Sequence, residues 1–255
     1  SGYFKSMAAG PLALLALWYH LFLGGMATVL LANDAYAFMV AWEVMALSSY
    51  FLVTTDHKVP EIRRAGFLYL LIAHVGAVAL LLTFGVLQGG HGDYTFDTMR
   101  LAQMTPFWAS VAFLLALFGF GAKAGLVPMH VWLPEAHPAA PSPVSALMSG
   151  VMLKVGLYGL LRVTSLYGAT PAWWGGLLLV LGAASALYGA ALAAGQGDIK
   201  RLLAYSSIEN VGIVTTGIGV ALLGRAAARP EWVALGLGGA LLHVLFHSLF
   251  KPLLF

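Results

Sequence analysis

Residues 107–166 read FWASVAFLLALFGFGAKAGLVPMHVWLPEAHPAAPSPVSALMSGVMLKVGLYGLLRVTSL. Two apolar runs, near 107–127 and 143–166, flank a connection that is rich in proline. Each run reaches the roughly 20 residues that a helix needs to cross a bilayer. Each also holds a lysine, Lys123 or Lys154. The stretch therefore predicts two membrane-spanning helices that each carry a charge inside the membrane.

Five prolines interrupt the connection between these two runs. Proline has no backbone N–H and cannot continue a regular helix, so we expect a helix that is broken near Pro128. A break inside a membrane frees backbone groups and admits water, which would place Lys123 beside an irregular, wet segment. The prolines are Pro128, Pro134, Pro138, Pro141 and Pro143.

Further apolar runs of the same length bring the total to about eight. Hydrophobic residues make up 60% of the 255 positions and charged residues only 9%, against about 25% charged in soluble domains. A soluble fold could not bury so much apolar surface. The composition predicts an all-α, polytopic transmembrane helix bundle that forms a single membrane domain over 1–255. The predicted spans lie near 11–32, 35–54, 64–87, 107–127, 143–166, 173–195, 202–222 and 233–255.

The cysteine, charge and glycine content exclude several classes of function. No cysteine is present, which excludes disulfides and Cys-ligated metal clusters, and we expect no cofactor in this chain. The net charge of +3 comes without a basic run, so we do not expect nucleic acid as a partner. The 30 glycines suit close helix packing in lipid, and Gly182 and Gly189 share one such helix face. The chain ends inside an apolar run at Phe255, and we interpret it as an internal fragment.

Basic residues in the short loops give a weak preference for one orientation. With the N-terminus in the cytoplasm, six of them fall on the inner side and four on the outer side, in the direction of the positive-inside rule. The inner residues are Lys5, Lys58, Arg63, Arg64, Lys200 and Arg201, and the outer ones are Arg100, Arg162, Arg225 and Arg229.

Several ionisable side chains fall inside the predicted spans. Placing Lys or Asp at a helix centre costs at least about 2.5 kcal/mol, so such groups normally face the bundle interior, a partner or water. We therefore predict a buried path for protons or other cations. Its candidate members are Glu43, His74, Lys123, Lys154, Glu209, His243, His247 and Lys251.

The run LLHVLFHSLFKP has the most informative geometry. His243, His247 and Lys251 are spaced four apart, so they share one helix face, with a rise of about 6 Å per step. Imidazole exchanges protons near neutral pH. Desolvation favours the neutral form of a lysine and a nearby carboxylate favours the charged form. Movement of Glu43 toward or away from Lys123 would therefore switch that lysine between holding and releasing a proton.

Each of these residues also has a structural interpretation. A single lysine can snorkel or pair without transporting anything, although three intramembrane lysines together favour a shared function. His74 is evenly balanced between a core and a proton role. Glu209 could cap its helix or pair with Lys200 or Arg201, about two turns away. No defensible zinc motif is formed by the spacing of His130, Glu135 and His137.

Four segments match a known family. They are AWEVMALSSYFLV (41–53), GAKAGLVPMHVWLPEAHPAAPSPVSALMSGVMLKVGLYGLLR (121–162), DIKRLLAYSSIENVGI (198–213) and LLHVLFHSLFKPLLF (241–255). With them the chain resembles the antiporter-like proton-translocating subunits shared by respiratory complex I, Mrp-type Na+/H+ antiporters and membrane-bound hydrogenases. Glu209 in SSIENVGI and His74 in AHVG look most like the large antiporter-like subunit of hydrogenase-4 and formate hydrogenlyase complexes.

The resemblance implies two inverted five-helix repeats, each with a broken helix. It places the first repeat at 11–166 and part of the second at 173–255. It also implies that Glu43 and Lys123 form a Glu–Lys pair and that Lys154 is a central relay lysine. The relay that enters the second repeat would consist of His243, His247 and Lys251.

The function implied by the resemblance is proton translocation by a non-redox subunit of a redox-driven complex, in a bacterial or archaeal cytoplasmic membrane. The complex would be of the hydrogenase-4, formate hydrogenlyase or complex I type. Its partners would be lipid, other membrane-arm subunits and a soluble redox module, and the chain would bind no redox cofactor.

Two alternative functions stay open. One is an Mrp-type Na+/H+ antiporter subunit, and the other is a structural scaffold in which the lysines only lock helices together.

Overall fold

The computed structural model describes residues 12–255, and all regular secondary structure in that range is helical. The predicted all-α class is therefore confirmed. The one β-type feature among the described residues is an isolated bridge between Asp34 and Thr95. Lys5 and the expected start of the first span at residue 11 lie outside the described residues.

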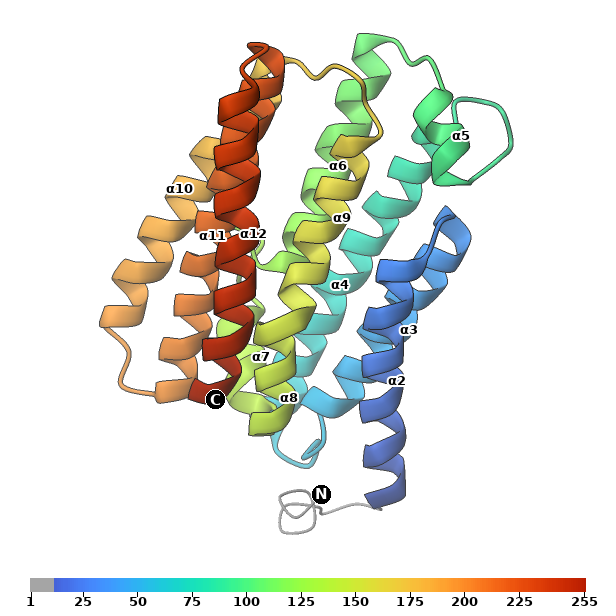
Figure 1. The fold of residues 1–255 in the computed structure, drawn as a ribbon. Helices are drawn as coiled ribbons and strands as arrows, with labels where there is room; N and C mark the ends of the chain where they lie inside the picture. The colour runs from blue at the N-terminus through green and yellow to red at the C-terminus, as the bar shows by residue number, and fades with distance from the viewer. Residues whose placement is uncertain (1–11) are drawn as a thin grey trace.

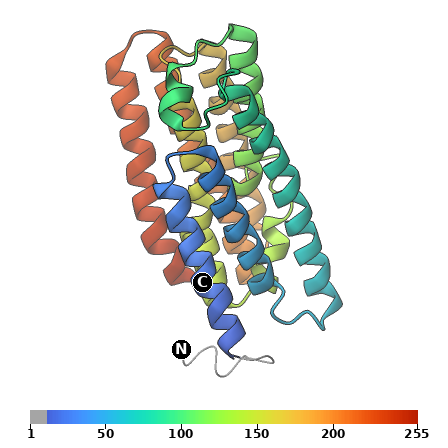
Figure 2. The same ribbon diagram turned by 90° about the vertical axis from the view of Figure 1, so that its right-hand side faces the viewer.

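Eight helical segments within 12–255 are long and apolar enough to cross a membrane, as the hydropathy predicted. They form an elongated bundle in which the start of the first of these helices, at Leu12, and the end of the last, at Leu254, lie toward the same end (Figures 1 and 2). The segments are α2 (Leu12–Leu31), α3 (Ala35–Val53), α4 (Pro60–Leu87), α6 (Pro106–Ala124), the combined α8 (Ser142–Leu147), η1 (Met148–Met152) and α9 (Leu153–Ser165), α10 (Ala172–Ala194), α11 (Ile199–Ala226) and α12 (Pro230–Leu254).

Polar first turns explain why some helices start earlier than the apolar runs. The α4 helix begins with a proline at Pro60, and Asp198 caps α11 by accepting a hydrogen bond from the Arg201 backbone N–H at 2.8 Å. Asp34 caps α3 in the same way through the Ala37 N–H. Hydropathy marks only the part of a helix that lies in lipid, so these charged turns fell outside the predicted ranges.

The predicted helix break is present, but it begins before Pro128. The α6 helix ends at Ala124, and Gly125 caps it in a left-handed conformation with φ of 77°. Such a cap strongly favours glycine because a Cβ would clash with the backbone. The Trp132 indole then donates to the Ala122 carbonyl at 2.8 Å, which folds the chain back on the end of α6 before the short helix α7 (Leu133–Ala139) begins.

Side chains from neighbouring helices satisfy the backbone groups that the break leaves free. The Val127 N–H donates to the Ser185 hydroxyl of α10 at 3.1 Å. At the end of α7, Lys200 Nζ of α11 donates to the Ala140 carbonyl at 2.8 Å. The broken segment is therefore held by α10 and α11, so helices from the two predicted repeats meet at this point.

A π-helical turn, η1, interrupts the span after the break. Hydropathy and residue spacing did not predict this turn. A π-turn accommodates one extra residue per turn, changes which residues face the bundle, and is frequent at functional sites. Lys154 follows it directly, in the first turn of α9.

Close packing of α10 on α11 follows the glycine positions. A Cβ added at Gly182 would lie 2.6 Å from the Thr216 nitrogen, and one at Gly189 would lie 2.7 Å from the Tyr205 carbonyl oxygen. Both contacts are too short for a real side chain. The predicted backbone-to-backbone packing is thus confirmed at these two glycines.

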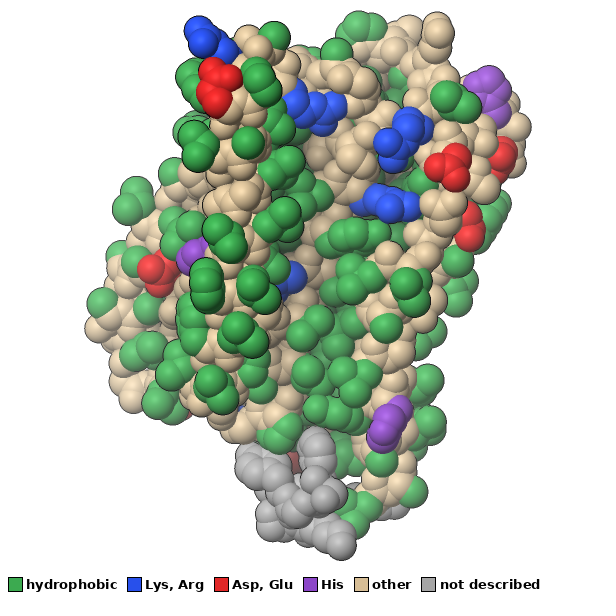
Figure 3. Space-filling view, in the orientation of Figure 1, with side chains coloured by type: hydrophobic (Ala, Val, Ile, Leu, Met, Phe, Trp, Pro, Cys, Tyr) green, Lys and Arg blue, Asp and Glu red, His purple; other side chains and the backbone are tan. Residues whose placement is uncertain are grey.

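The short helix α5 (Phe96–Leu101) lies in the long connection between α4 and α6. Hydrogen bonds from the Thr95 backbone and the Thr98 side chain lower the pKa of the Asp93 carboxyl in this connection. Asn33 ties the region to the bundle, because it donates to Asp97 and accepts from Arg162 of α9. These polar groups lie at one end of the bundle, and apolar side chains cover most of the flank in Figure 3.

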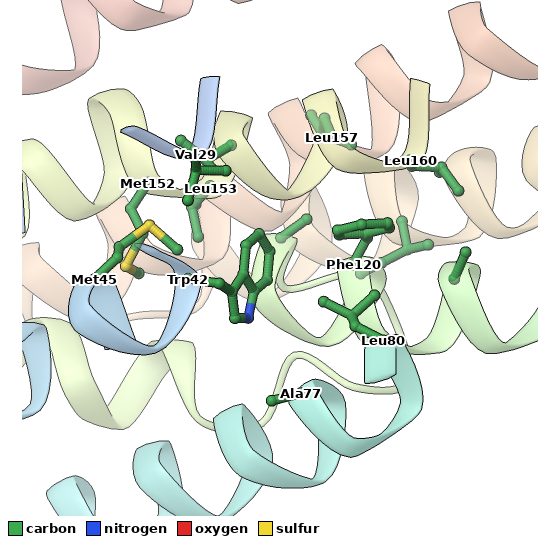
Figure 4. Packing of buried hydrophobic residues seen from close by; sticks show 14 of the residues in the cluster. Val29, Trp42, Met45, Ala77, Leu80, Phe120, Met152, Leu153, Leu157 and Leu160 are labelled. Carbon is green, nitrogen blue, oxygen red and sulfur yellow. The ribbon is translucent and has the colours of Figure 1, made fainter. Parts of the chain in front are cut away.

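An aromatic and methionine core fills the space between α3, α4, α6 and α9 (Figure 4). The Trp42 ring lies 5.4 Å from the Phe120 ring and 1% of the residue is exposed. Met45 and Met152 lie beside it in the same cluster. This rigid core forms one wall of the site that holds Lys123.

Candidate functional site

Lys123 lies in the last turn of α6, beside the helix break, and is only 3% exposed. Its Nζ donates to the Tyr69 hydroxyl of α4 at 2.9 Å. The same nitrogen lies 5.1 Å from the centre of the Tyr69 ring and 5.8 Å from that of Trp42. Aromatic faces stabilise a cation at such distances. Among the described residues, no carboxylate lies within 4.0 Å of this nitrogen.

The Tyr69 hydroxyl extends this contact to a second hydroxyl. It lies 2.5 Å from Ser49 Oγ of α3, and Ser49 in turn lies 2.8 Å from the Met45 carbonyl oxygen. Sequence analysis did not select Tyr69 or Ser49. Their residue types are common in apolar helices, and only their position against a buried lysine gives them meaning.

Glu43 pairs with His74 across α3 and α4. The carboxylate Oε2 lies 3.6 Å from His74 Nε2, and the two side chains are 33% and 48% exposed respectively. His74 Nδ1 lies 3.0 Å from the Leu70 carbonyl oxygen. A carbonyl only accepts, so Nδ1 carries a hydrogen, and Nε2 faces the carboxylate with the position that a second proton would occupy. The two candidates therefore face each other at ion-pair distance, while Lys123, the partner implied by the resemblance, donates to Tyr69.

Lys154 of α9 is half-buried and donates from Nζ to the Ser149 carbonyl inside η1. The π-turn exposes that carbonyl to the lysine. Lys154 also lines a recess of about 270 Å³ together with Leu30 of α2 and Val244 of α12. The accessible lining of this recess is apolar, and a cavity without polar partners stays dry, so the recess supplies no water path by itself.

Three serine hydroxyls lie between Lys154 and Lys251. Ser149 Oγ lies 2.7 Å from Ser207 Oγ of α11, and the adjacent Ser206 Oγ accepts a hydrogen bond from Lys251 Nζ at 2.8 Å. Lys251 is 1% exposed, and both Ser149 and Ser207 are fully buried. We call Ser149, Ser206 and Ser207 the serine bridge. It lies between a lysine of α9 and a lysine of α12, and sequence analysis did not select any of its three members.

The three residues spaced four apart on α12 lie on one side of the helix, as predicted. His243 Nε2 lies 2.7 Å from Asn210 Oδ1 of α11. The His243 and His247 rings are stacked, with centroids 6.3 Å apart. His247 is 1% exposed, and its Nε2 has no hydrogen-bond partner within residues 12–255. The imidazoles thus lead along α12 toward the buried Lys251.

Glu209 is half-buried on α11, and no ion pair or hydrogen bond joins its carboxylate to another described side chain. The structural alternative required Lys200 or Arg201 as its partner. Arg201 instead pairs with Glu135 at 2.9 Å, and Lys200 donates to the Ala140 carbonyl. The pairing alternative for Glu209 is therefore wrong.

His137 of α7 is a polar residue that sequence analysis set aside. It is 0% exposed, its ring stacks on Phe255 at 4.8 Å, and neither ring nitrogen has a hydrogen-bond partner in the described part of the chain. A buried imidazole without partners is uncommon and usually marks ordered water or a functional group. The sequence feature that could have pointed to His137 is its place in the WLPEAH segment, but its spacing was considered only for a zinc site.

These contacts define the class of protein. It is a polytopic α-helical membrane protein with buried lysines, histidines and hydroxyls at the contacts between its helices. The chain belongs to the family described as "NADH:quinone oxidoreductase/Mrp antiporter, TM", which matches residues 32–255. The predicted family and the predicted membrane localisation are both confirmed.

Two proteins of Escherichia coli are similar to this chain. It is 45% identical to hydrogenase-4 component B of Escherichia coli over 99% of this chain and 38% of that protein. It is 39% identical to formate hydrogenlyase subunit 3 of the same organism over 88% of this chain and 36% of that protein. The chain therefore spans well under half the length of these relatives.

A solved structure has the same arrangement of helices. The membrane-bound sulfane sulfur reductase, an archaeal respiratory membrane complex, matches with a TM-score of 0.85 and 25% identity, over 98% of this chain and 50% of the matched chain. The similarity covers nearly all of this chain, so the matched chain shares the fold described above.

Proposed function

We propose that this chain is the proton-translocating part of an antiporter-like subunit in a redox-driven membrane complex of the hydrogenase-4, formate hydrogenlyase or complex I type. The observation that carries the proposal is the serine bridge. Lys154 donates to the Ser149 carbonyl, the Ser149 and Ser207 hydroxyls share a hydrogen bond, and Lys251 donates to Ser206, which is next to Ser207 on α11. The bridge thus brings two lysines close to one group of hydroxyls in the bundle interior, where isolated lysines would be costly.

In this proposal protons enter near the Glu43–His74 pair, and Lys123 responds to the charge of that pair. Lys154 then exchanges with Lys251 across the serine bridge. His243, His247 and His137 supply neutral imidazoles that can accept on one nitrogen and donate from the other. Glu209 contributes a negative charge on the α11 side of the same path.

The partners in this proposal are other membrane-arm subunits, a soluble redox module and lipid. Relatives named as components of hydrogenase-4 and formate hydrogenlyase support the membrane partners. The chain would hold no redox cofactor, so electron transfer would belong to the soluble module.

Proton uptake into liposomes that contain the complete complex tests the proposal. With Lys123→Ala or Lys251→Ala we expect redox-driven uptake to fall to background, because each change removes a carrier from the path. Lys58→Ala, in an exposed loop, is the matched control and should behave like the unaltered protein. Unaffected uptake in both interior variants would favour the scaffold alternative. A requirement for Na+ would instead favour an Mrp-type antiporter, which the family description also includes.

A further inference from the structure

Lys123 has a direct partner that differs from the expected glutamate. Within residues 12–255, the side-chain atom that accepts a hydrogen bond from its Nζ is the Tyr69 hydroxyl. Glu43 follows Trp42 on α3, and its carboxylate is directed to His74. Successive residues on a helix point about 100° apart, so Trp42 can face Lys123 while Glu43 faces α4 at another point.

The hydrogen atoms around Tyr69 can be assigned from the donor and acceptor types. A charged lysine only donates, so the Tyr69 oxygen accepts from it. Ser49 lies 2.8 Å from the Met45 carbonyl, which only accepts, so the Ser49 hydrogen is used there. Tyr69 must then donate to Ser49 Oγ at 2.5 Å. The three groups form one directed chain from Lys123 through Tyr69 and Ser49 to a backbone carbonyl.

The same atoms fit the neutral lysine when the chain is reversed. A neutral amine has a lone pair that can accept the Tyr69 hydrogen, and Tyr69 can then accept from Ser49. The Met45 carbonyl loses a side-chain donor but is still an acceptor within its helix. Both protonation states of Lys123 are therefore satisfied by rotation of two hydroxyls, without movement of the helices.

We propose that the Tyr69 hydroxyl, oriented by Ser49, is the positioning residue of Lys123, and that it supports this lysine in both its charged and its neutral form. The inference rests on the proposed function, because it assigns Lys123 to the path. Tyr69 keeps its own proton in both states. Its ring and that of Trp42 add a cation–π surface that exists only for the charged form.

Packing makes Tyr69 suitable for a clean substitution. The residue is 1% exposed, its ring lies 4.9 Å from that of Trp132, and its hydroxyl also lies 3.6 Å from Met152 Sδ. Tyr69→Phe retains the ring and removes only the oxygen. The matched control is Tyr167→Phe, since Tyr167 is also packed on a tryptophan and its hydroxyl donates to the Ala109 carbonyl at 3.4 Å, far from Lys123 along the chain.

The experiment measures redox-driven proton uptake as a function of pH in liposomes that contain the complete complex. Hydrogen bonds to a charged group are stronger than neutral ones, so loss of the hydroxyl weakens the charged form of Lys123 more than the neutral form. For Tyr69→Phe we therefore expect uptake about tenfold lower at the optimum and a profile displaced toward lower pH by about one unit, the displacement that 1.36 kcal/mol corresponds to. Tyr167→Phe should match the unaltered complex in both respects. An unaltered rate in Tyr69→Phe, or a lower rate with an undisplaced profile, would overturn the inference.

A second variant covers the case in which Tyr69→Phe does not assemble. Ser49→Ala keeps the phenol but removes its acceptor, and it should displace the profile in the same direction by a smaller amount, whereas Ser49→Thr should restore it. A Ser49→Ala complex with an unaltered profile would contradict the inference.

Lys123→Ala is measured in parallel. If it retains full uptake, the proposed function fails, whereas loss in Lys123→Ala with normal Tyr69→Phe and Ser49→Ala removes only the inference about Tyr69.

Discussion

Lys123 and Lys251 are almost equally buried, at 3% and 1% exposure, yet their surroundings differ. Lys123 lies against two aromatic rings, and its hydroxyl chain ends at a backbone carbonyl of α3. Lys251 donates to a serine whose neighbour leads on to Ser149 and Lys154. The first lysine thus lies against aromatic rings, whereas the second lies beside buried hydroxyls of α11 and η1. Burial alone thus does not define the role of an intramembrane lysine.

The difference can be tested first on the Lys251 side. Ser206→Ala removes the acceptor of a buried charged donor, and hydrogen bonds to charged groups contribute about 1.5–3 kcal/mol, so we expect proton uptake to fall at least about tenfold. Ser110→Ala is the control, because Ser110 only bonds back to the Pro106 carbonyl of its own helix. Normal uptake in Ser206→Ala would mean that Lys251 does not depend on the serine bridge.

A smaller effect is expected when the helix that carries Ser206 and Ser207 is displaced. Gly182→Ala places a Cβ 2.6 Å from the Thr216 nitrogen of α11, and such overpacking costs about 1–3 kcal/mol. Thermal unfolding of the purified complex should show this loss. Proton uptake should decline more than after an equally destabilising substitution in the core beside Lys123, because α11 carries Ser206 and Ser207 of the serine bridge.

The control for this substitution lies on the same helix. Gly176 has no atom within 4 Å of the place where a Cβ would lie, so Gly176→Ala should leave stability unchanged or slightly raised. Equal destabilisation by both substitutions would show that helix propensity, and not the contact with α11, determines the result.

Sequence alone predicted the large features and the charged residues, but not their partners. The apolar runs defined all eight spans, and the spacing of His243, His247 and Lys251 placed them on one face of α12. The left-handed cap at Gly125 and the π-turn η1 depend on backbone geometry that hydropathy does not register. The division into inverted repeats at 11–166 and 173–255 stays a prediction.

The polar partners were missed for a different reason. Tyr69, Ser149, Ser206 and Ser207 are neutral residues that occur in many membrane helices, so their types carry little information. Their significance comes from contacts between helices that are far apart in the sequence. The implied Glu43–Lys123 pair stays a prediction, because in this structure Glu43 faces His74 and Lys123 donates to Tyr69.

The most direct test is a double-mutant cycle on the serine bridge, with Ser149→Ala, Ser207→Ala and the double variant measured by redox-driven proton uptake in liposomes containing the complete complex. The two hydroxyls are 2.7 Å apart and share one hydrogen bond. If they act together between Lys154 and Lys251, the second substitution should add little once the first is made, so the effects will be strongly non-additive. Effects that simply add would show that the two serines act independently and would contradict a connected path between the two lysines.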